Sequence, residues 1–304
     1  MRVMQFADYG PPEVLQPAEV EMPQPGAGQI LVKIAAAAVN PADYKWREGM
    51  FRAHIPLPLP HVVGYDAAGT VEALGGGVDR FAPGDRVIVH LDAIEKGGYA
   101  EYAVRDAAVC AKVPDGLDMA IAAALPTGGL TGVQQIEEHV RPEPGQTVLI
   151  TGATGAVGRF ALHAALAMGV KVVAAVRRSQ FAEAERLGAT QVIELGGNIP
   201  DDLAFDHVAD TVGGPEVAAL CRRMRPGGRI ITVSTTPIDP AGLPATPQFI
   251  GLHPDAERLA RLAADVASGT LEVPIARRMP LEQAAEAQRL VEAGGLGGKI
   301  VLIP

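Results

Sequence analysis

The stretch from Gly145 to Ser234 alternates short apolar runs with helical patterns, and this alternation restricts the possible folds more than any other feature. Runs with the length and β-branched content of buried strands fall at residues 147–151, 171–176, 190–195, 205–213 and 227–234. Helical patterns lie at residues 159–169, 180–188 and 215–224. Strands that alternate with helices in this way form βαβ units with parallel strands. The stretch therefore predicts a doubly wound α/β domain with a parallel sheet.

A glycine-rich turn joins the first of these strands to the first helix, with the sequence Gly152-Ala-Thr-Gly155-Ala-Val-Gly158. Dinucleotide sites need glycine where the turn is tight, where the backbone approaches a pyrophosphate and where the helix packs on the sheet. The helix N-terminus then offers free N–H groups to the pyrophosphate. The spacing is not G-x-G-x-x-G, so a glycine turn without a ligand stays an alternative. The predicted contacts are Gly152, Thr154, Gly155, Ala156, Val157 and Gly158.

The residues after the second strand indicate which nicotinamide cofactor would bind. An acidic residue about 20 positions after the glycines would hold a free ribose 2′-hydroxyl. Arg177, Arg178 and Ser179 stand there instead. Two guanidinium groups and a hydroxyl suit a 2′-phosphate, which favours NADPH unless both arginines are merely solvated. Open α/β sheets bind ligands at the carboxyl ends of their strands, where this chain has Thr211, Val212 and Ser234.

Proline usage separates this stretch from the rest of the chain. Fourteen of the 25 prolines fall between Pro11 and Pro144, and none falls between Gly145 and Ile199. The proline-rich part has short β-branched runs that predict antiparallel strands in a barrel-like β domain, and the C-terminal tail returns to this style. We therefore expect one domain from residues 1–122 and 269–304, with a dinucleotide-binding domain inserted at residues 123–268.

Charge and cysteine content limit the partners and the compartment. The net charge of −9 leaves no basic excess to neutralise phosphates, so neither nucleic acid nor an anionic membrane is expected as a partner. The N-terminal residues lack the apolar core of a signal peptide, and no run of about 18 apolar residues predicts a transmembrane helix. Two distant cysteines, Cys110 and Cys221, fit a reducing, cytoplasmic location.

Beyond these patterns, the whole chain resembles the zinc-independent quinone oxidoreductase family of the medium-chain dehydrogenase/reductase superfamily. The resemblance rests on VNPADYKWREG at residues 39–49, GYDAAGTVEALGGGVDRFAPGDRV at 64–87, GGYAEY at 97–102, ALPTGGLTG at 124–132, TGATGAVG at 151–158 and GGKIVLIP at 297–304. It implies a GroES-like β-barrel-type catalytic domain and a Rossmann domain, with the active site in the cleft between them. It also implies a homodimer, for which edge pairing near residues 247–253 is expected.

The resemblance also predicts a protein without catalytic zinc. Zinc-dependent relatives use a cysteine, a Gly-His-Glu motif and a third ligand, whereas Asn40, Tyr65-Asp66 and Thr127 stand in those places here. Asparagine, tyrosine and threonine do not supply the ligands that Zn²⁺ prefers. We expect Asp66 to brace the fold and Tyr65 to face the site as a hydrogen-bond donor.

The same resemblance suggests roles for residues near the reacting groups. The expected catalytic residues are Asn40, Tyr44, Lys45, Tyr65 and Thr127, and the expected cofactor contacts in this region are Asn40, Thr127, Thr131 and Lys299. Relatives often have tyrosine where Lys45 stands, so an ammonium or nearby Tyr44 would replace a phenolic donor. Lys299 either reaches the cofactor or is a surface strand residue. NADPH-using relatives often have lysine at Gln180 and tyrosine at Leu195, so the two arginines would have to compensate.

Without a metal to act as a Lewis acid, the substrate must carry its own electron sink. Quinones and α,β-unsaturated carbonyls do so, since the anion formed by hydride addition needs only hydrogen bonds and a proton. The leading prediction is NADPH-dependent reduction of a quinone. The alternatives are an NADPH-dependent alkenal or enone double-bond reductase and, outside enzymes, a nucleotide-binding protein without turnover.

Overall fold

The computed structural model describes residues 1–92, 94–95 and 97–304, and the chain divides into two compact units. The first unit consists of residues 1–127 and 254–304, and residues 128–253 form the second unit. These limits differ from the expected ones, because helix α7 (Ala256–Ala267) belongs to the first unit. Helix α7 buries Leu259, Leu262 and Ala263, and it packs beside strand β8 (Ala111–Lys112) of that unit.

The second unit is built on a six-stranded parallel sheet in the order β11-β10-β9-β12-β13-β14. Its strands are β9 (Thr147–Thr151), β10 (Lys171–Val176), β11 (Gln191–Glu194), β12 (His207–Asp210), β13 (Ile230–Thr232) and β14 (Gln248–Phe249). Numbered from β9, this is the 3-2-1-4-5-6 order of doubly wound dinucleotide-binding domains. The predicted fold class is therefore confirmed for this unit.

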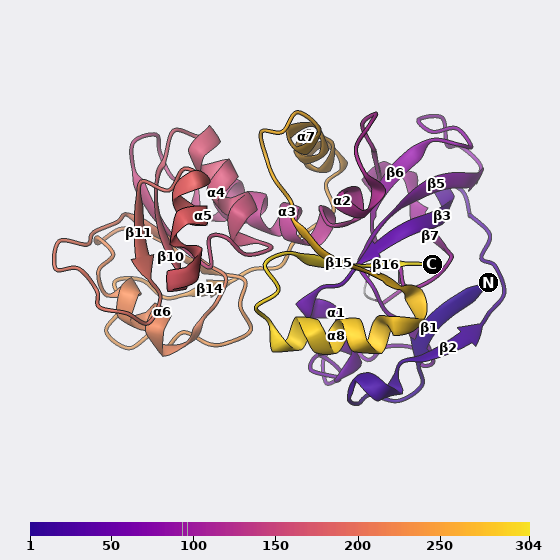
Figure 1. Ribbon diagram of the computed structural model, residues 1–304, viewed down its shortest axis with the longest axis horizontal. Coiled ribbons are helices and arrows are strands. Elements are labelled where there is room, and N and C mark those ends of the chain that lie inside the picture. Colours follow the sequence, from indigo (N-terminus) through magenta and orange to yellow (C-terminus); the bar gives the residue numbers. More distant parts are fainter. Residues whose placement is uncertain (93, 96) are drawn as a thin grey trace. The chain divides into compact units, whose positions relative to one another are not determined.

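Helices flank this sheet, as the α4 and α5 ribbons beside β10 and β11 show in Figure 1. The helical segments are α3 (Pro126–Gln134, which begins in the first unit), η3 (Gln135–Val140), α4 (Gly158–Ala167), η4 (Arg178–Gln180), α5 (Phe181–Arg186) and α6 (Gly214–Cys221). Strands β9, β10 and β12 are almost wholly buried, which agrees with the apolar residues at the centre of β9 and β10. On one side of the sheet, Leu149, Val173 and Val208 pack with Val217 of α6.

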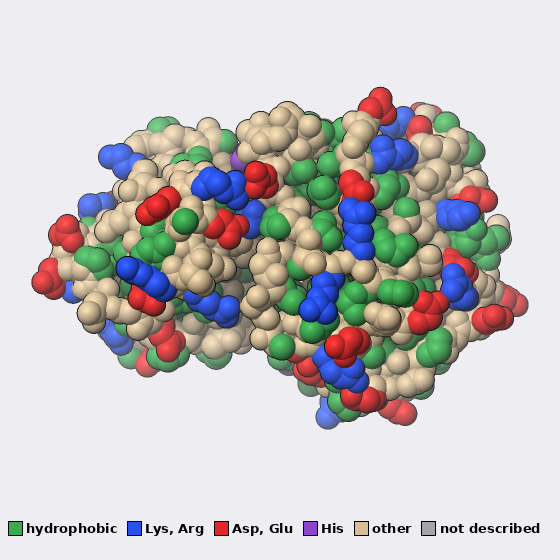
Figure 2. Space-filling view, viewed as in Figure 1, with side chains coloured by type: hydrophobic (Ala, Val, Ile, Leu, Met, Phe, Trp, Pro, Cys, Tyr) green, Lys and Arg blue, Asp and Glu red, His purple; other side chains and the backbone are tan. Residues whose placement is uncertain are grey.

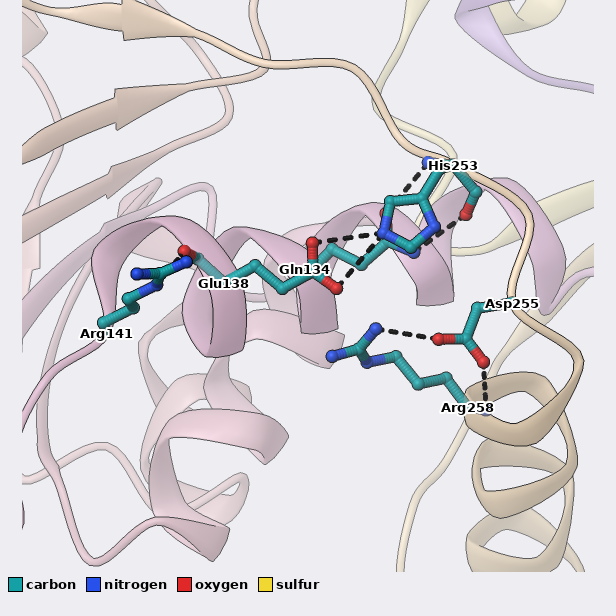
Figure 3. Close-up of polar contacts among 6 residues, drawn as sticks. All are labelled: Gln134, Glu138, Arg141, His253, Asp255 and Arg258. Atoms are coloured by element: carbon teal, nitrogen blue, oxygen red, sulfur yellow. Dashed lines mark hydrogen bonds and ion pairs between the residues drawn. The ribbon is translucent and has the colours of Figure 1, made fainter.

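Side chains of α3 and η3 hold the last residue of the second unit (Figure 3). The Gln134 amide donates from Nε2 to the His253 carbonyl at 2.8 Å and accepts the His253 N–H at 3.0 Å. The His253 ring contacts the Glu138 carboxylate at 3.1 Å, and Arg141 Nε donates to the Glu138 carbonyl. These contacts fix the backbone where the chain leaves the sheet. Separately, in the first unit, Asp255 caps α7 by accepting the Arg258 N–H at 2.9 Å.

The first unit contains two mainly antiparallel sheets. One has the order β15-β16-β3-β5-β6-β8 with β7 also paired to β3, and the other has the order β2-β1-β4. The strands not yet given are β1 (Arg2–Phe6), β2 (Gln16–Glu19), β3 (Gln29–Ala38), β4 (His61–Val62), β5 (Asp66–Leu74), β6 (Arg86–His90), β7 (Tyr102–Asp106), β15 (Ile275–Pro280) and β16 (Lys299–Ile303). Of these pairs only β15–β16 is parallel among the described residues. This agrees with the predicted β domain.

The first unit also has helices that the strand-rich pattern did not predict. Its remaining helical segments are η1 (Pro12–Val14), α1 (Pro41–Arg47), η2 (Ala107–Val109), α2 (Met119–Ala123), η5 (Leu281–Gln283) and α8 (Ala284–Ala293). Helix α8 connects the parallel pair β15 and β16 and packs against α1, beside which it runs in Figure 1. Parallel neighbours need such a crossover connection, whereas antiparallel ones do not.

Candidate dinucleotide and substrate sites

The glycine-rich turn of the second unit follows β9 and leads into α4. Gly152 has a φ of +61°, and a Cβ at this position would lie 2.6 Å from Thr211 Oγ1. A Cβ at Gly158 would lie 2.1 Å from the Gly152 carbonyl oxygen. Both positions therefore require glycine for a turn as compact as this one. Gly155 and Ala156 are exposed at the tip of the turn.

The hydroxyl of Thr154 in this turn is buried and has no hydrogen-bond partner among the described residues. Buried polar atoms in proteins nearly always have a partner, so an unpaired one beside a helix N-terminus fits a ligand site. Val157 precedes α4 as its N-cap residue. The glycine cradle and this orphaned hydroxyl fit the pyrophosphate of a dinucleotide.

A buried carboxylate joins the carboxyl ends of three strands in this unit. Asp210, at the end of β12, accepts hydrogen bonds from Thr151 Oγ1 at 2.6 Å and from Thr232 Oγ1 at 2.5 Å. It also accepts the Gly213 N–H at 2.9 Å. Asp210 and Thr151 were not among the predicted site residues. The signal available in the sequence is an acid at the end of the strand HVAD, directly before the predicted contacts Thr211 and Val212. Asp210 thus fixes the strand ends around the switch point between β9 and β12, where such sheets bind ligands.

The predicted strand-end residues lie on this frame. The Thr211 N–H donates to Thr151 Oγ1 at 2.9 Å, and Ser234 Oγ donates to the Val212 carbonyl at 2.7 Å. Thr131 lies on α3 in the same unit and is nearly buried. The structure therefore brings Thr211, Val212 and Ser234 together beside the glycine turn, whose Gly152 packs on Thr211 and Val212.

The predicted 2′-phosphate residues directly follow β10. Arg177, Arg178 and Ser179 are all exposed. The Arg178 guanidinium lies 4.7 Å from the centroid of the Phe181 ring, a cation–π distance that leaves its N–H edge accessible. Gln180 accepts the Arg177 N–H at 3.3 Å rather than pointing to a ligand. Two exposed guanidinium groups and a hydroxyl are thus gathered at one strand end.

In the first unit, two predicted site residues meet around one carboxylate. Asp66 is fully buried, and its Oδ2 accepts Asn40 Nδ2 at 2.9 Å. Its Oδ1 accepts Thr127 Oγ1 at 2.7 Å and the Thr127 N–H at 3.0 Å. The predicted bracing role of Asp66 is confirmed. The Asn40–Asp66–Thr127 cluster joins α1, β5 and the start of α3.

Lys299 extends this cluster from β16. Its side chain is nearly buried, and Nζ donates to the Val39 carbonyl at 3.1 Å and to Asn40 Oδ1. Burial lowers the pKa of Lys299, while Asp66 and Asp43 act in the opposite direction. Lys299 is therefore not a surface strand residue. Its expected contact with the cofactor stays a prediction.

Tyr65 lies beside this cluster with an unpaired hydroxyl. It is 8% exposed, and its hydroxyl has no hydrogen-bond partner among the described residues. Its ring stacks on His90 at a centroid distance of 6.2 Å. Burial and the carboxylates of Asp43, Asp92 and Asp66 raise the pKa of Tyr65, and burial lowers the pKa of His90. Tyr65 is thus a neutral phenol at physiological pH, able to donate a hydrogen bond.

Helix α1 carries the other candidates. Tyr44 and Lys45 are half-buried on it. Burial, together with the carboxylates of Glu292 and Glu48, raises the pKa of Tyr44. Burial lowers the pKa of Lys45. Asp43, which the sequence analysis did not single out, is fully buried and accepts the Asn40 N–H at 2.7 Å. It also accepts the Tyr99 hydroxyl at 2.9 Å, and burial raises the pKa of Asp43 to about 7. Asp43 therefore anchors the start of α1.

The described residues do not fit a catalytic zinc ion. Within residues 1–92, 94–95 and 97–304, no group of three or more His, Cys, Asp or Glu side chains is placed to hold a metal. The amide of Asn40 and the hydroxyl of Thr127 both bind Asp66 instead. Cys110 and Cys221 are buried free thiols whose pKa burial raises to about 12. None of these groups offers Zn²⁺ the thiolate and imidazole ligands it prefers.

A search of the described part of the chain finds no helix with the length and apolar character needed to span a membrane.

Comparisons with known proteins agree with this architecture. Residues 26–115 match the model of the alcohol dehydrogenase GroES-like domain, and residues 187–302 match the zinc-binding dehydrogenase model. The chain is 32% identical to the 2-methylene-furan-3-one reductase of Solanum lycopersicum, over all of this chain and 79% of that protein.

Two solved structures are similar over the whole chain. The quinone oxidoreductase from Coxiella burnetii has a TM-score of 0.90 and 30% identity, covering 100% of this chain and 99% of that one. The mycobacterial protein Rv1454c complexed with NADPH has a TM-score of 0.83 and 28% identity, with complete coverage of both chains.

Proposed function

Because the chain belongs to the quinone oxidoreductase family of the medium-chain dehydrogenase/reductase superfamily, and is thus an oxidoreductase that uses a nicotinamide dinucleotide, we propose that it reduces quinones with NADPH. In this proposal the second unit binds the dinucleotide, and the first unit supplies the hydrogen bonds to the substrate without a catalytic metal.

The exposed residues Arg177, Arg178 and Ser179 support NADPH over NADH. Guanidinium groups bind phosphate through paired N–H donors, and a 2′-phosphate is the group that distinguishes the two cofactors. The structural relative described as complexed with NADPH is consistent with this preference. The turn from Gly152 to Gly158 would hold the pyrophosphate through its backbone N–H groups.

The observation that carries the proposal for the reaction is the Asn40–Asp66–Thr127 cluster. By the family resemblance, Asn40, the Tyr65-Asp66 pair and Thr127 stand in the places of the metal-site residues of zinc-dependent relatives. Asn40 and Thr127 both donate a hydrogen bond to Asp66. Without a Lewis acid from the protein, a substrate with its own electron sink is favoured, and quinones have one. The nicotinamide supplies the hydride when the cofactor is bound.

The residues of the first unit would then stabilise the charge that develops on the substrate oxygen. Tyr65 is the best donor, because its hydroxyl is neutral and has no partner among the described residues. A preorganised donor in a buried site stabilises an oxyanion strongly, since the donor does not reorganise during the reaction. Lys45 and Tyr44, which are half-buried, are the candidates for further donors.

Reduction of an enone double bond is the second candidate function. It is favoured by the similarity to the 2-methylene-furan-3-one reductase, whose name describes a double bond conjugated to a ketone. The same donors would stabilise the enolate formed in that reaction. The choice between a quinone and an enone depends on the shape of the substrate pocket.

We further propose a cytoplasmic homodimer that acts on small molecules. The two buried free thiols are consistent with a reducing compartment. Edge strand β14 carries Phe249, which is 61% exposed and suited to pairing with a second copy. Acidic and basic side chains are interspersed on the face shown in Figure 2, and with the net charge of −9 this argues against a nucleic-acid partner.

Steady-state assays with NADPH test the proposal. Oxidation of NADPH by 1,4-benzoquinone well above the rate without enzyme supports quinone reduction. A quinone rate at background together with turnover of a 2-alkenal would select the enone reductase. Size-exclusion chromatography with light scattering tests the dimer separately.

A further inference from the structure

We propose that Lys299 is a positioning residue that supplies the counter-charge to buried Asp66 and so holds the side chains of Asn40 and Thr127 in place. The inference rests on the proposed function in one respect only, namely that Asn40 and Thr127 lie beside the reacting groups. The contacts that define the role of Lys299 all lie within the first unit.

Strand pairing places Lys299 opposite Asn40. Strand β16 is antiparallel to β3, with Val301 opposite Ala38, and the Val39 N–H donates to the Ile300 carbonyl at 2.9 Å. One further step along both strands brings Lys299 level with Asn40. Its ammonium group is 3.1 Å from the Val39 carbonyl oxygen and hydrogen-bonds Asn40 Oδ1.

The ammonium determines how the Asn40 amide is oriented. An ammonium group only donates hydrogen bonds, so the amide oxygen must face Lys299 and the amide NH₂ must face away. On that side it meets Asp66 Oδ2 at 2.9 Å. Asp66 in turn receives the single hydroxyl hydrogen of Thr127 at 2.7 Å. Among the described residues, Asp66 is the one acceptor that the structure shows for the Asn40 NH₂ group, so its second N–H is available to a ligand, and Thr127 meets any ligand as an acceptor.

Charge explains why a lysine is needed here. Asp66 is fully buried, and an isolated carboxylate in such a place is strongly destabilised. Lys299 reaches Asp66 through the Asn40 side chain, which bonds the ammonium at one end and Asp66 at the other, and the ammonium is attracted to Asp66 and Asp43. The other titratable groups that interact with Asp66 are Asp43, Tyr65, His90 and Tyr99. Burial favours the neutral form of these four groups and of Lys299 too, but Asp66 and Asp43 favour the ammonium of Lys299, and its two hydrogen bonds to oxygen atoms need a donor. We therefore assign the counter-charge of Asp66 to Lys299.

A double-mutant cycle on the unliganded protein tests this charge pairing. Lys299→Met, Asp66→Asn and the double variant are compared with the wild type by urea unfolding followed by circular dichroism. Removing one member of a buried charge pair leaves the other uncompensated, whereas removing both does not. We expect the two substitutions to be coupled by at least about tenfold in the unfolding equilibrium constant, which is about 1.4 kcal/mol. Additive effects would overturn the inference.

The kinetic parameters separate positioning from simple packing. Lys299→Met should lower kcat/KM with the quinone, and Asp66→Asn added to it should lower kcat/KM little further, because both residues act through the side chains of Asn40 and Thr127. Lys33→Met, at an exposed position on β3, should keep the wild-type kcat/KM. Independent losses of kcat/KM in the two single variants would contradict the positioning role.

Two further outcomes keep the test decisive. If Lys299→Met does not fold, a folded double variant supports the counter-charge, and an unfolded double variant overturns it. If Lys299 instead only contacts the cofactor, Lys299→Met weakens NADPH binding without any coupling to Asp66. A wild type that fails to reduce quinones would refute the proposed function but leave the unfolding cycle intact.

Discussion

On the proposed preference for NADPH, replacement of both arginines after β10 should produce a protein that no longer distinguishes NADPH from NADH. Hydrogen bonds to charged groups contribute about 1.5–3 kcal/mol each. Arg177 and Arg178 are exposed, so we use the lower value for each of them. Arg177→Ala with Arg178→Ala should therefore weaken NADPH binding by about 3 kcal/mol, or roughly 150-fold. NADH lacks the 2′-phosphate, and its affinity should change less than about threefold.

Fluorescence titration of the nicotinamide in both cofactors measures this difference directly. The titrations should be repeated at several salt concentrations, since contacts between exposed charges weaken with ionic strength. Arg222→Ala with Arg223→Ala is the matched control, because these neighbouring arginines are also exposed in the second unit, at the end of α6. Equal losses for NADPH and NADH in the Arg177/Arg178 variant would show that neither arginine reads the 2′-phosphate.

Three further substitutions test other parts of the sites. Gly158→Ala should weaken the binding of NADPH and of NADH by more than about tenfold in titrations, because the added Cβ would lie 2.1 Å from the Gly152 carbonyl oxygen. Gly251→Ala, at a position with open space around it, should leave the binding of both cofactors unchanged. Tyr65→Phe should lower kcat/KM for the quinone by about 10²-fold without loss of stability in urea, since the removed hydroxyl has no partner among the described residues. Asp43→Asn should reduce the loss of stability between about pH 4 and pH 7. Because burial raises the pKa of Asp43 from 3.8 to about 7, this carboxyl stabilises the fold fully only below about pH 4, and up to about 4 kcal/mol is lost as the pH rises to about 7. An unchanged pH dependence of unfolding in that variant would contradict this assignment.

The second unit is predictable because its signals are local. A buried strand, a turn and a helix follow one another within about 20 residues, and each is encoded by its own periodicity. The backbone between Gly152 and Gly158 is also constrained by short-range contacts, so its glycines could be recognised from sequence. Asp210 was missed because its partners Thr151 and Thr232 come from other strands. No periodicity reports such contacts across a sheet.

The first unit is less predictable because its site residues also come from distant parts of the sequence. Asn40 was recognised only through a family resemblance, and Lys299 lies 259 residues from it in sequence while bonding to its side chain. Helix α7 was assigned to the wrong side of the boundary, because an amphipathic pattern shows that a helix is buried on one side but not what covers it. Helix α8 was not predicted, because it lies between the two strand-like runs that became β15 and β16. Long-range pairing, and not local propensity, determines these features.

The buried Lys299 also makes the Asn40–Asp66–Thr127 cluster less suited to a metal ion. By the family resemblance, residues 40, 66 and 127 stand where zinc-dependent relatives carry or position ligands. In this structure Lys299 bonds Asn40 at one end of the cluster. A fixed ammonium beside the cluster repels a second cation and already balances the carboxylate of Asp66. Restoring a cysteine at position 40 would therefore not restore zinc binding by itself, because the charge at position 299 and the missing imidazole at position 65 would both still oppose it.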